Sequence, residues 1–193
     1  AGKYSSLVGA ISSSSCQPCS AGKFSPTGGN DAESDCYECG AGKYSDIVGS
    51  IAEPNCLPCP LGKYSTSTGA STSESCISCG TGKFLKFTGS QSEDDCARCG
   101  AGKFSSEAGA TSSGTCVDCV AGKYSPVVGA ASDATCLSCV AGTYSTSAGS
   151  QTQADCVSCE AGKYSTSLGA NSADTCYPCA AGKFSSAQAN SAE

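Results

Sequence analysis

CVSCEAGKYSTSLGANSADTC, residues 156–176, contains a C-x-x-C pair, sixteen intervening residues and the first cysteine of another pair. The bonding state of these cysteines decides the fold, because the spacing suits a zinc site, a redox centre or a disulfide framework. When the chain is written in rows of twenty from Ala1, C-x-x-C recurs in the same place nine times and accounts for all 18 cysteines. This period predicts a tandem array of small structural units.

Other positions of the twenty-residue repeat are also fixed. Position 2 is Gly and position 4 is Tyr or Phe in all ten rows, while position 3 is Lys except at Thr143. Position 5 is Ser except at Leu85, and position 9 is Gly except at Ala189. Repeat 1 is residues 1–20, and later repeats follow in steps of twenty. We interpret residues 1–193 as a single tandem-repeat array of about nine and a half units, and expect it to be a window of a longer chain.

The composition points to a scaffold that depends on covalent bonds. Twenty residues cannot enclose a hydrophobic core, so each unit needs disulfide or metal support. Gly at positions 2 and 9, with Ser and Thr between, predicts short strands joined by turns, with little or no helix. The expected fold is a set of small disulfide-rich repeats in an elongated linear array of short β-loops. The position-4 ring is expected to be each unit's small core, with a ladder of rings that stacks sugars or bases as the alternative.

The charge distribution limits the partners. A net charge of −6 argues against nucleic acid, whose phosphates require a basic face. Lys at position 3 and acids in the second half of the repeat predict a basic and an acidic stripe, as solvated faces or for lateral pairing of arrays. No apolar run in this window is long enough to span a membrane.

The sequence offers no catalytic constellation. It contains no His, which excludes Ser-His and Cys-His nucleophile pairs. The acidic clusters at 31–35 and 93–95 are not repeated in other rows, which favours surface charge over calcium binding. We therefore expect neither enzymatic activity nor a cofactor or metal.

The cysteine spacing is compatible with three bonding states. A four-thiolate zinc site fits C-x2-C-x16-C-x2-C, but it would double the period to forty and would leave one of the nine pairs unmatched. A redox C-x-x-C requires a helix N-terminus, whereas Gly- and Ser-rich coil follows every pair. We therefore favour disulfide bonds.

The strict period leaves three disulfide schemes open. Each C-x-x-C may close on itself, which makes a strained ring typical of redox sites. In a second scheme, the second Cys of one pair joins the first Cys of the next pair, as in Cys19–Cys36. In a third, the first Cys of one pair joins the second Cys of the next pair, as in Cys16–Cys39. We favour the scheme that contains Cys19–Cys36, because it closes one loop per unit and keeps the units as separate beads. Each closed loop stabilises the fold by about 3 kcal/mol. It leaves Cys16 and Cys179 unpaired within this window.

The unit C-x-A-G-K-[YF]-S…C-x-x-C resembles the cysteine-rich repeats of the tumour necrosis factor receptor and ephrin receptor-like class. The resemblance implies an extracellular ladder of small β-loops without enzymatic activity. Because this chain repeats one loop type, it is also similar to the monotonous arrays of giant surface and fibre proteins of algae and protists. Carried over to this sequence, the loop opened by a cysteine before x-x-G-K-Y implies the disulfides Cys19–Cys36, Cys39–Cys56, Cys59–Cys76, Cys79–Cys96, Cys99–Cys116, Cys119–Cys136, Cys139–Cys156 and Cys159–Cys176.

Two functions agree with these features. The first is a structural extracellular or cell-surface protein, a stiff rod or filament backbone that associates with itself or with other fibre chains. The second is a spacer or ligand-binding region of a receptor ectodomain. For the second, the candidate contact patch is Leu85, Lys86 and Phe87, where repeat 5 departs most from its neighbours.

Glycosylation would accompany the structural role. None of the four Asn residues lies in an N-x-[ST] sequon, so N-glycans are not expected. The Ser- and Thr-rich stretches are candidate sites for O-linked glycans, although Ser and Thr are also common turn residues. The candidate acceptors are Thr66, Ser67, Thr68, Thr146, Ser147, Thr166 and Ser167.

Overall fold

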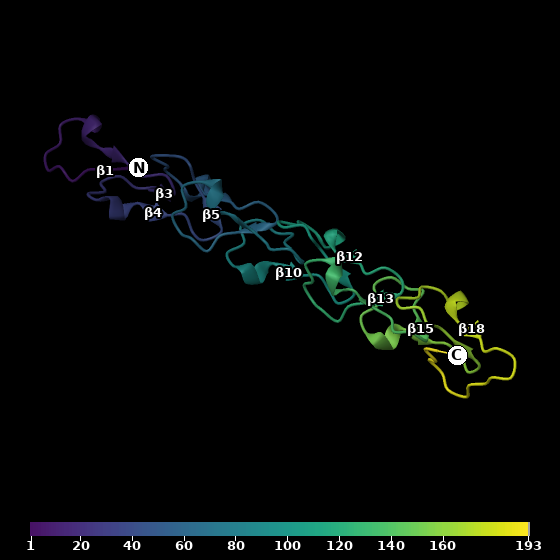
Figure 1. Cartoon of the computed structure of the whole chain (residues 1–193). Coiled ribbons are helices and arrows are strands. Elements are labelled where there is room, and N and C mark those ends of the chain that lie inside the picture. Colours follow the sequence, from purple (N-terminus) through teal and green to yellow (C-terminus); the bar gives the residue numbers. More distant parts are fainter. Residues whose placement is uncertain (193) are drawn as a thin grey trace. The chain divides into compact units, whose positions relative to one another are not determined.

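The structure is a computed structural model that describes residues 1–192 (Figure 1). Its regular elements are two-residue strands and three-residue 3-10 segments, which confirms the expectation of short β-elements with little or no helix. The strands are β1 (Lys3–Tyr4), β2 (Gln17–Pro18), β3 (Lys23–Phe24), β4 (Tyr37–Glu38), β5 (Lys43–Tyr44), β6 (Leu57–Pro58), β7 (Lys63–Tyr64), β8 (Ile77–Ser78), β9 (Lys83–Phe84), β10 (Ala97–Arg98), β11 (Lys103–Phe104), β12 (Val117–Asp118), β13 (Lys123–Tyr124), β14 (Leu137–Ser138), β15 (Thr143–Tyr144), β16 (Val157–Ser158), β17 (Lys163–Tyr164) and β18 (Tyr177–Pro178).

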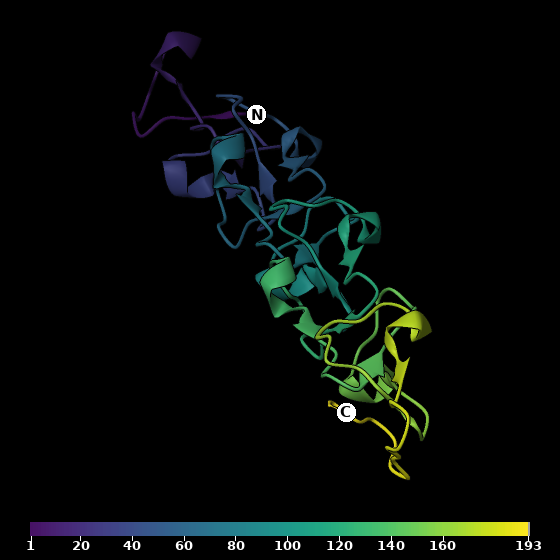
Figure 2. The same ribbon diagram turned by 45° about the vertical axis from the view of Figure 1, so that its right-hand side comes forward.

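The 3-10 segments directly precede the first cysteine of each pair. In the turned view of Figure 2 they stand at the edges of the ribbon, outside the hairpins. They are η1 (Ser13–Ser15), η2 (Glu33–Asp35), η3 (Glu53–Asn55), η4 (Ser73–Ser75), η5 (Glu93–Asp95), η6 (Ser113–Thr115), η7 (Asp133–Thr135), η8 (Gln153–Asp155) and η9 (Ala173–Thr175).

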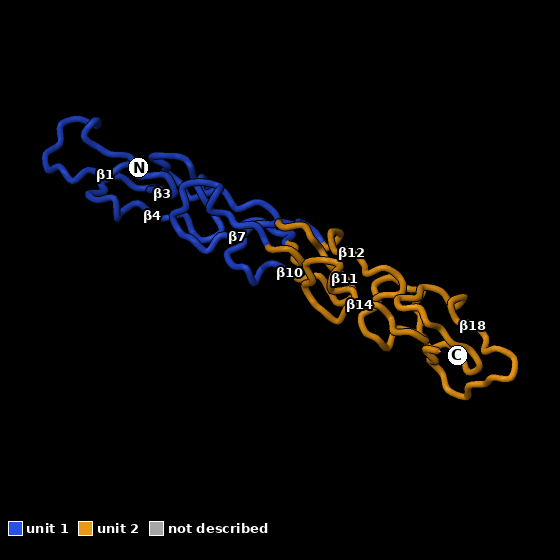
Figure 3. Tube along the Cα trace, viewed as in Figure 1, with its two compact units in different colours: residues 1–79, 85–97, 109–112 blue, residues 80–84, 98–108, 113–193 orange. Residues whose placement is uncertain are grey.

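The chain divides into two compact units (Figure 3). Unit 1 comprises Ala1–Cys79, Leu85–Ala97 and Gly109–Ser112, and unit 2 comprises Gly80–Phe84, Arg98–Ala108 and the chain from Ser113. The same local structure recurs in both. The fold is thus an array of small disulfide-rich repeats, as predicted.

Repeats 1 to 4 and 6 to 9 each form one minimal antiparallel hairpin. Its first strand holds the position-3 Lys and the position-4 ring, and its second holds the two residues inside C-x-x-C, so that Tyr44 faces Leu57. A tight turn leads into the first strand, where Lys43 N donates to Gly40 O at 3.1 Å. The hairpins are β1–β2, β3–β4, β5–β6 and β7–β8 in unit 1, and β11–β12, β13–β14, β15–β16 and β17–β18 in unit 2.

Backbone hydrogen bonds connect each repeat with the next. Gly22 N donates to Ser45 O at 2.7 Å, and Ser25 N donates to Ser50 O at 3.0 Å. The position-4 residue of one repeat also forms a parallel bridge with position 10 of the following repeat, as between Phe24 and Ser50. These bonds satisfy backbone groups that a two-residue hairpin leaves unpaired.

Further bonds skip one repeat. Gly49 N of repeat 3 donates to Cys19 O of repeat 1 at 2.8 Å, and Gly89 N of repeat 5 donates to Cys59 O of repeat 3 at 2.8 Å. The expectation that the units behave as separate beads is therefore wrong. The cause is glycine at positions 2 and 9, which lets the backbones of alternate repeats touch.

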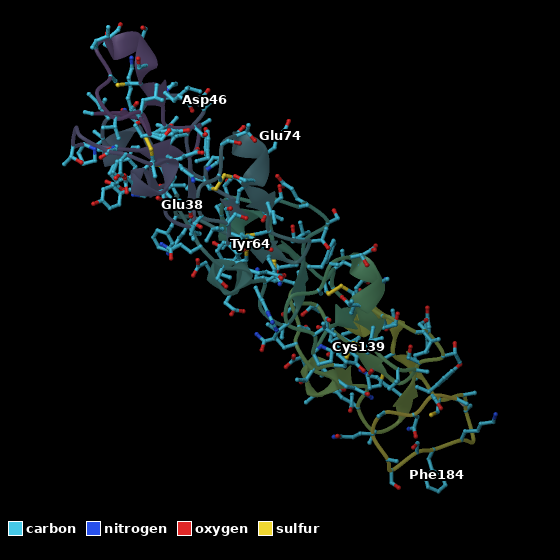
Figure 4. The ribbon with its side chains drawn as sticks, turned by 90° about the vertical axis from the view of Figure 1, so that its left-hand side faces the viewer. Glu38, Asp46, Tyr64, Glu74, Cys139 and Phe184 are labelled. Atoms are coloured by element: carbon cyan, nitrogen blue, oxygen red, sulfur yellow. A yellow bond between two sulfur atoms is a disulfide. The ribbon has the colours of Figure 1, made fainter. Side chains whose placement is uncertain are left out.

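The buried interior consists of sulfur, small side chains and backbone. The second cysteines of the pairs and the position-5 serines are almost fully buried in the inner repeats, with some of those at the two ends half-buried, whereas the position-4 rings are mostly half-buried. Phe184, at the C-terminal end of the described chain, is 91% exposed (Figure 4). The predicted role of the ring as each unit's core thus holds only in part. The clearest apolar cluster is Cys79, Leu85 and Cys96 in unit 1, against which Tyr64 packs.

Candidate functional site

The cysteines form one loop-closing disulfide per repeat. The structure contains the eight pairs that the resemblance implied, each with a sequence separation of 17. Their Cα–Cα distances of 5.6 to 5.9 Å lie in the ordinary range for disulfides. Cys16 and Cys179 are partly buried and have no disulfide partner. The bonded sulfurs are not thiolates, so they provide neither the ligands of a zinc site nor redox thiols.

Each C-x-x-C is a junction between two closed loops. Cys36 ends the loop that Cys19 opens, and Cys39 opens the next loop, which Cys56 ends. The backbone holds the second cysteine on both sides, because Cys39 N donates to Gly22 O and Cys39 O accepts from Gly69 N, both at 2.8 Å. This surrounding backbone explains why the cysteine is fully buried in a chain without an ordinary core.

The charged side chains pair within and between adjacent loops. Lys103 Nζ lies 2.6 Å from Asp118 Oδ1 across the β11–β12 hairpin, and Lys43 pairs with Glu53. Such exposed pairs contribute about 0 to 1 kcal/mol each. The position-3 lysines of these repeats thus have acidic partners nearby, and the basic and acidic stripes stay a prediction.

Three carboxylates, those of Asp35, Asp95 and Asp155, cap the turns that lead into 3-10 segments. Asp155 Oδ2 accepts from Gln151 N at 2.7 Å and from Thr152 N at 2.9 Å, and Asp35 Oδ2 accepts in the same way from Asp31 N and Ala32 N. These backbone N–H groups, with Thr152 and Ala32 foremost, lower the pKa of Asp155 and of Asp35 below the ordinary aspartate value. The acids of the second half of the repeat thus have a local structural role. Among residues 1–192, no group of three or more His, Cys, Asp or Glu is arranged to hold a metal ion.

The hydroxyl side chains divide into two classes. The position-5 serines are buried, and in several repeats their Oγ accepts the N–H of position 7, as Ser65 does from Ser67 at 3.3 Å. Positions 6 to 8 form an exposed loop tip. All seven candidate O-glycan acceptors lie at such tips: Thr66, Ser67, Thr68, Thr146, Ser147, Thr166 and Ser167. Sequence reasoning did not separate the buried serines from these exposed hydroxyls.

The candidate contact patch of repeat 5 is only partly at the surface. Leu85 is 2% exposed and packs in the cluster with Cys79 and Cys96, so its assignment to an exposed patch was wrong. The physical reason is that position 5 faces the interior in the repeats, where Ser is normally buried. Phe87 is exposed, and Lys86 Nζ lies 5.3 Å from its ring centroid. The structure therefore leaves Lys86 and Phe87 as the accessible pair.

Small hollows recur beside the hairpins of unit 2. One has a volume of about 120 Å³ and another, forty residues further along the chain, about 160 Å³. Both are smaller than the 300 to 1,000 Å³ usual for small-molecule sites. The walls include Phe104, Val117, Lys123 and the Cys119–Cys136 disulfide in the first, and Tyr144, Val157, Lys163 and the Cys159–Cys176 disulfide in the second.

Figure 4 summarises what the repeats present to their surroundings. Cys139 is buried, whereas the carboxylates of Asp46 and Glu74 lie at the surface. Within the part of the chain that the structure describes, no helix has the length and apolar character needed to cross a membrane.

Comparison with known proteins gives one clear match. The family model described as "tyrosine-protein kinase ephrin type A/B receptor-like" matches residues 30–76, 52–96 and 102–156, which together cover more than half of the chain. The matched segments overlap and follow one another, as expected for tandem repeats. No curated protein matches the sequence.

Proposed function

Because the chain belongs to the ephrin type A/B receptor-like family of cysteine-rich repeats, we propose that it is a structural extracellular protein. Its repeats would form the stiff backbone of a rod or filament. The observation that carries the proposal is the combination of one disulfide per repeat with backbone hydrogen bonds to the next and the next-but-one repeat.

Stiffness follows from the way in which these bonds connect the repeats. Bending the array at repeat 2 would strain the bond from Gly22 N to Ser45 O and also the one from Gly49 N to Cys19 O, which spans that repeat. Repeat arrays gain stability from such interfaces as a sum over neighbours. A long run of nearly identical repeats is therefore suited to bearing load along its length.

An extracellular or cell-surface location is part of the proposal. Disulfides form and persist in oxidising compartments, and small units without a hydrophobic core depend on them. Eight structural disulfides in a chain of 193 residues would not be maintained in a reducing cytosol. We further propose that the protein is not an enzyme, since the sequence has no His to activate a Ser or Cys nucleophile.

O-linked glycosylation at the loop tips is a second part of the proposal. It is supported by the exposure of hydroxyls at positions 6 to 8 in many repeats. Intact-mass measurement of the native protein before and after chemical deglycosylation tests it. We expect a loss of mass that maps to loop-tip peptides, and an unchanged mass would contradict it.

The alternative function is a spacer or ligand-binding region of a receptor ectodomain. The family match favours it, because the description of that family refers to receptors. The accessible pair Lys86 and Phe87 in repeat 5 would be the place to search for a ligand contact. Substitution of both by Ser would weaken binding if this function is correct.

Electron microscopy of the native material separates the two functions. The structural proposal predicts long, thin particles of constant width, together with other fibre chains or further copies of this one. Compact, isolated particles would contradict it and would favour the receptor alternative.

A further inference from the structure

The loop tips alternate between apolar and polar along the chain. In repeats 1, 3, 5, 7 and 9, positions 7 and 8 contain at least one large apolar residue, whereas repeats 2, 4, 6, 8 and 10 have only small or polar residues there. The large apolar residues at these positions are Leu7, Val8, Ile47, Val48, Phe87, Val127, Val128 and Leu168. The sequence thus has a second period of forty residues inside the period of twenty.

The structure gives this alternation a spatial meaning within unit 1. A Cβ built on Gly2 would lie 2.2 Å from Gly49 O and 3.0 Å from Ile51 Cγ2, so the tip of repeat 3 rests on repeat 1. A Cβ built on Gly42 would lie 2.2 Å from Gly89 O in the same way, so the tip of repeat 5 rests on repeat 3. Odd repeats therefore stack on odd repeats, and their apolar tips form one row.

The even repeats of unit 1 form a separate row. Gly22 of repeat 2 contacts the backbone of Gly69 in repeat 4, and the tips there contain Thr27, Ser67 and Thr68. Thr68 Oγ1 donates to Glu38 Oε2 at 2.7 Å, so this row engages in polar contacts. Unit 1 consequently presents an apolar row and a polar row of loop tips.

The apolar row is substantially exposed. The exposed fractions are 45% for Ile47, 59% for Val48, 56% for Ile51 and 63% for Phe87. These four side chains leave an exposed apolar surface on the order of 400 Å², and Leu7, Val8 and Ile11 of repeat 1 continue the row. A standard protein interface takes about 800 Å² from each partner.

We propose that the apolar row, defined as Leu7, Val8, Ile11, Ile47, Val48, Ile51 and Phe87, is covered by the same row of a second copy of this chain. The inference deepens the proposed structural role and rests on it, because it names the surface by which arrays join side by side. The polar row stays in solvent, where glycans on Ser67 or Thr68 would not obstruct the contact.

Two features favour a second copy over another occupant. Apolar side chains recur once every forty residues, and a second copy has the same interval, so contacts made in one repeat are made again two repeats further on. A surface that pairs with itself also gives an isologous interface, which is the commonest kind in homo-oligomers. Two odd repeats supply only part of the area that a standard interface takes from each partner, so the contact requires several odd repeats in one register. Several weak contacts in one register then add as a multivalent interaction.

Analytical ultracentrifugation of the chain expressed without glycans tests the proposal. The test variant is Ile47→Ser/Val48→Ser/Phe87→Ser, and the matched control is Thr27→Ser/Ser67→Ala/Thr68→Ala at the same positions of even repeats. All six side chains are exposed, so both variants should keep the fold, which a non-reducing peptide map and circular dichroism verify. We expect the wild-type chain and the control to dimerise alike, and the test variant to dissociate with a Kd raised at least tenfold.

The proposal is overturned by three results. The first is a wild-type chain that stays monomeric up to about 100 µM, which places the Kd of any dimer above that concentration. The second is a test variant that dimerises as well as the control. The third is a monomeric wild-type chain that binds phosphatidylcholine vesicles through the same three residues, which would make lipid the occupant. Electron microscopy keeps the two proposals distinguishable, since long thin particles of the test variant would leave the structural role intact while the lateral contact fails.

Discussion

A Cβ atom built on Gly22 would lie 2.1 Å from the carbonyl oxygen of Gly69, which belongs to the next-but-one repeat. No side chain can occupy that space, because the obstacle is backbone and not a movable side chain. Gly22 also has a φ of +83°, which L-residues rarely adopt. The constant glycine at position 2 is thus explained by a contact between repeats rather than by the turn alone.

Replacement of this glycine should therefore separate alternate repeats. We expect Gly22→Ala to lower the free energy of unfolding by about 3 kcal/mol or more, from the clash and the strained backbone together. Limited proteolysis and urea denaturation measure the effect. Gly40→Ala is the matched control, since a Cβ there meets nothing within 4 Å, and it should change stability by less than about 0.5 kcal/mol. Equal losses for the two variants would refute the backbone contact.

Removal of one disulfide should destabilise its loop. The variant Cys119→Ser/Cys136→Ser opens a loop with a sequence separation of 17 and should lose about 3 kcal/mol of stability. Cys16→Ser, which has no disulfide partner in the structure, is the control and should unfold like the wild-type chain. A non-reducing peptide map supplies the direct check, with the peptides of Cys159 and Cys176 linked. Free thiols at these positions would contradict the fold.

Repeat 5 distinguishes a buried from an exposed apolar side chain. We expect Leu85→Ala to cost about 2 to 3 kcal/mol, because it leaves a cavity beside Tyr64 and the Cys79–Cys96 disulfide. Phe87→Ala should leave the stability of the chain almost unchanged when measured under dilute conditions, since its ring is 63% exposed. Urea denaturation followed by tyrosine fluorescence compares the two. A larger loss for Phe87→Ala would reverse the assignment of interior and surface.

Acid should weaken the caps formed by Asp35 and Asp155. Backbone N–H groups lower the pKa of Asp155 in the folded chain below the unfolded value of 3.8. The contribution of Asp155 to the stability of the fold is therefore present above pH 3.8 and is lost as the pH falls through the folded pKa. We expect the thermal midpoint to fall between about pH 5 and pH 2, and to fall less steeply in Asp155→Asn.

The control for the acid experiment is Asp46→Asn. It removes the same charge from an exposed loop tip without breaking the cap at Gln151 and Thr152. Its pH profile should follow that of the wild-type chain. If it flattened the profile as much as Asp155→Asn, net charge and not the cap would explain the acid sensitivity.

Much of the local structure could be predicted from the sequence. The twenty-residue period, the glycines and the cysteines together indicated short strands, turns and a disulfide scaffold. The ephrin receptor-like resemblance, which the family match confirms, implied a loop from Cys19 to Cys36, and the structure has that bond. These features depend on residues close in sequence, where turn chemistry and spacing leave few alternatives.

The contacts between alternate repeats could not be predicted in the same way. Gly49 N bonds to Cys19 O through backbone atoms alone, and the constant glycines that permit this contact are explained equally well by tight turns. Leu85 was misplaced for a related reason, because the burial of position 5 arises from neighbouring repeats and the usual Ser there suggested a surface turn. The alternation at positions 7 and 8 was visible in the sequence, but it had no meaning until alternate repeats were known to stack.

The loop-closing disulfides also determine what a single break in the chain can do. Every peptide bond between Cys19 and Cys36 is bridged by their disulfide, so hydrolysis at one loop tip leaves both fragments covalently joined. Between Cys19 and Cys176, only the three peptide bonds inside each C-x-x-C lack such a bridge, and they lie in or beside the second strand of a hairpin. Hydrolysis at one of the exposed loop tips, positions 6 to 8 of a repeat inside a closed loop, thus does not sever the molecule.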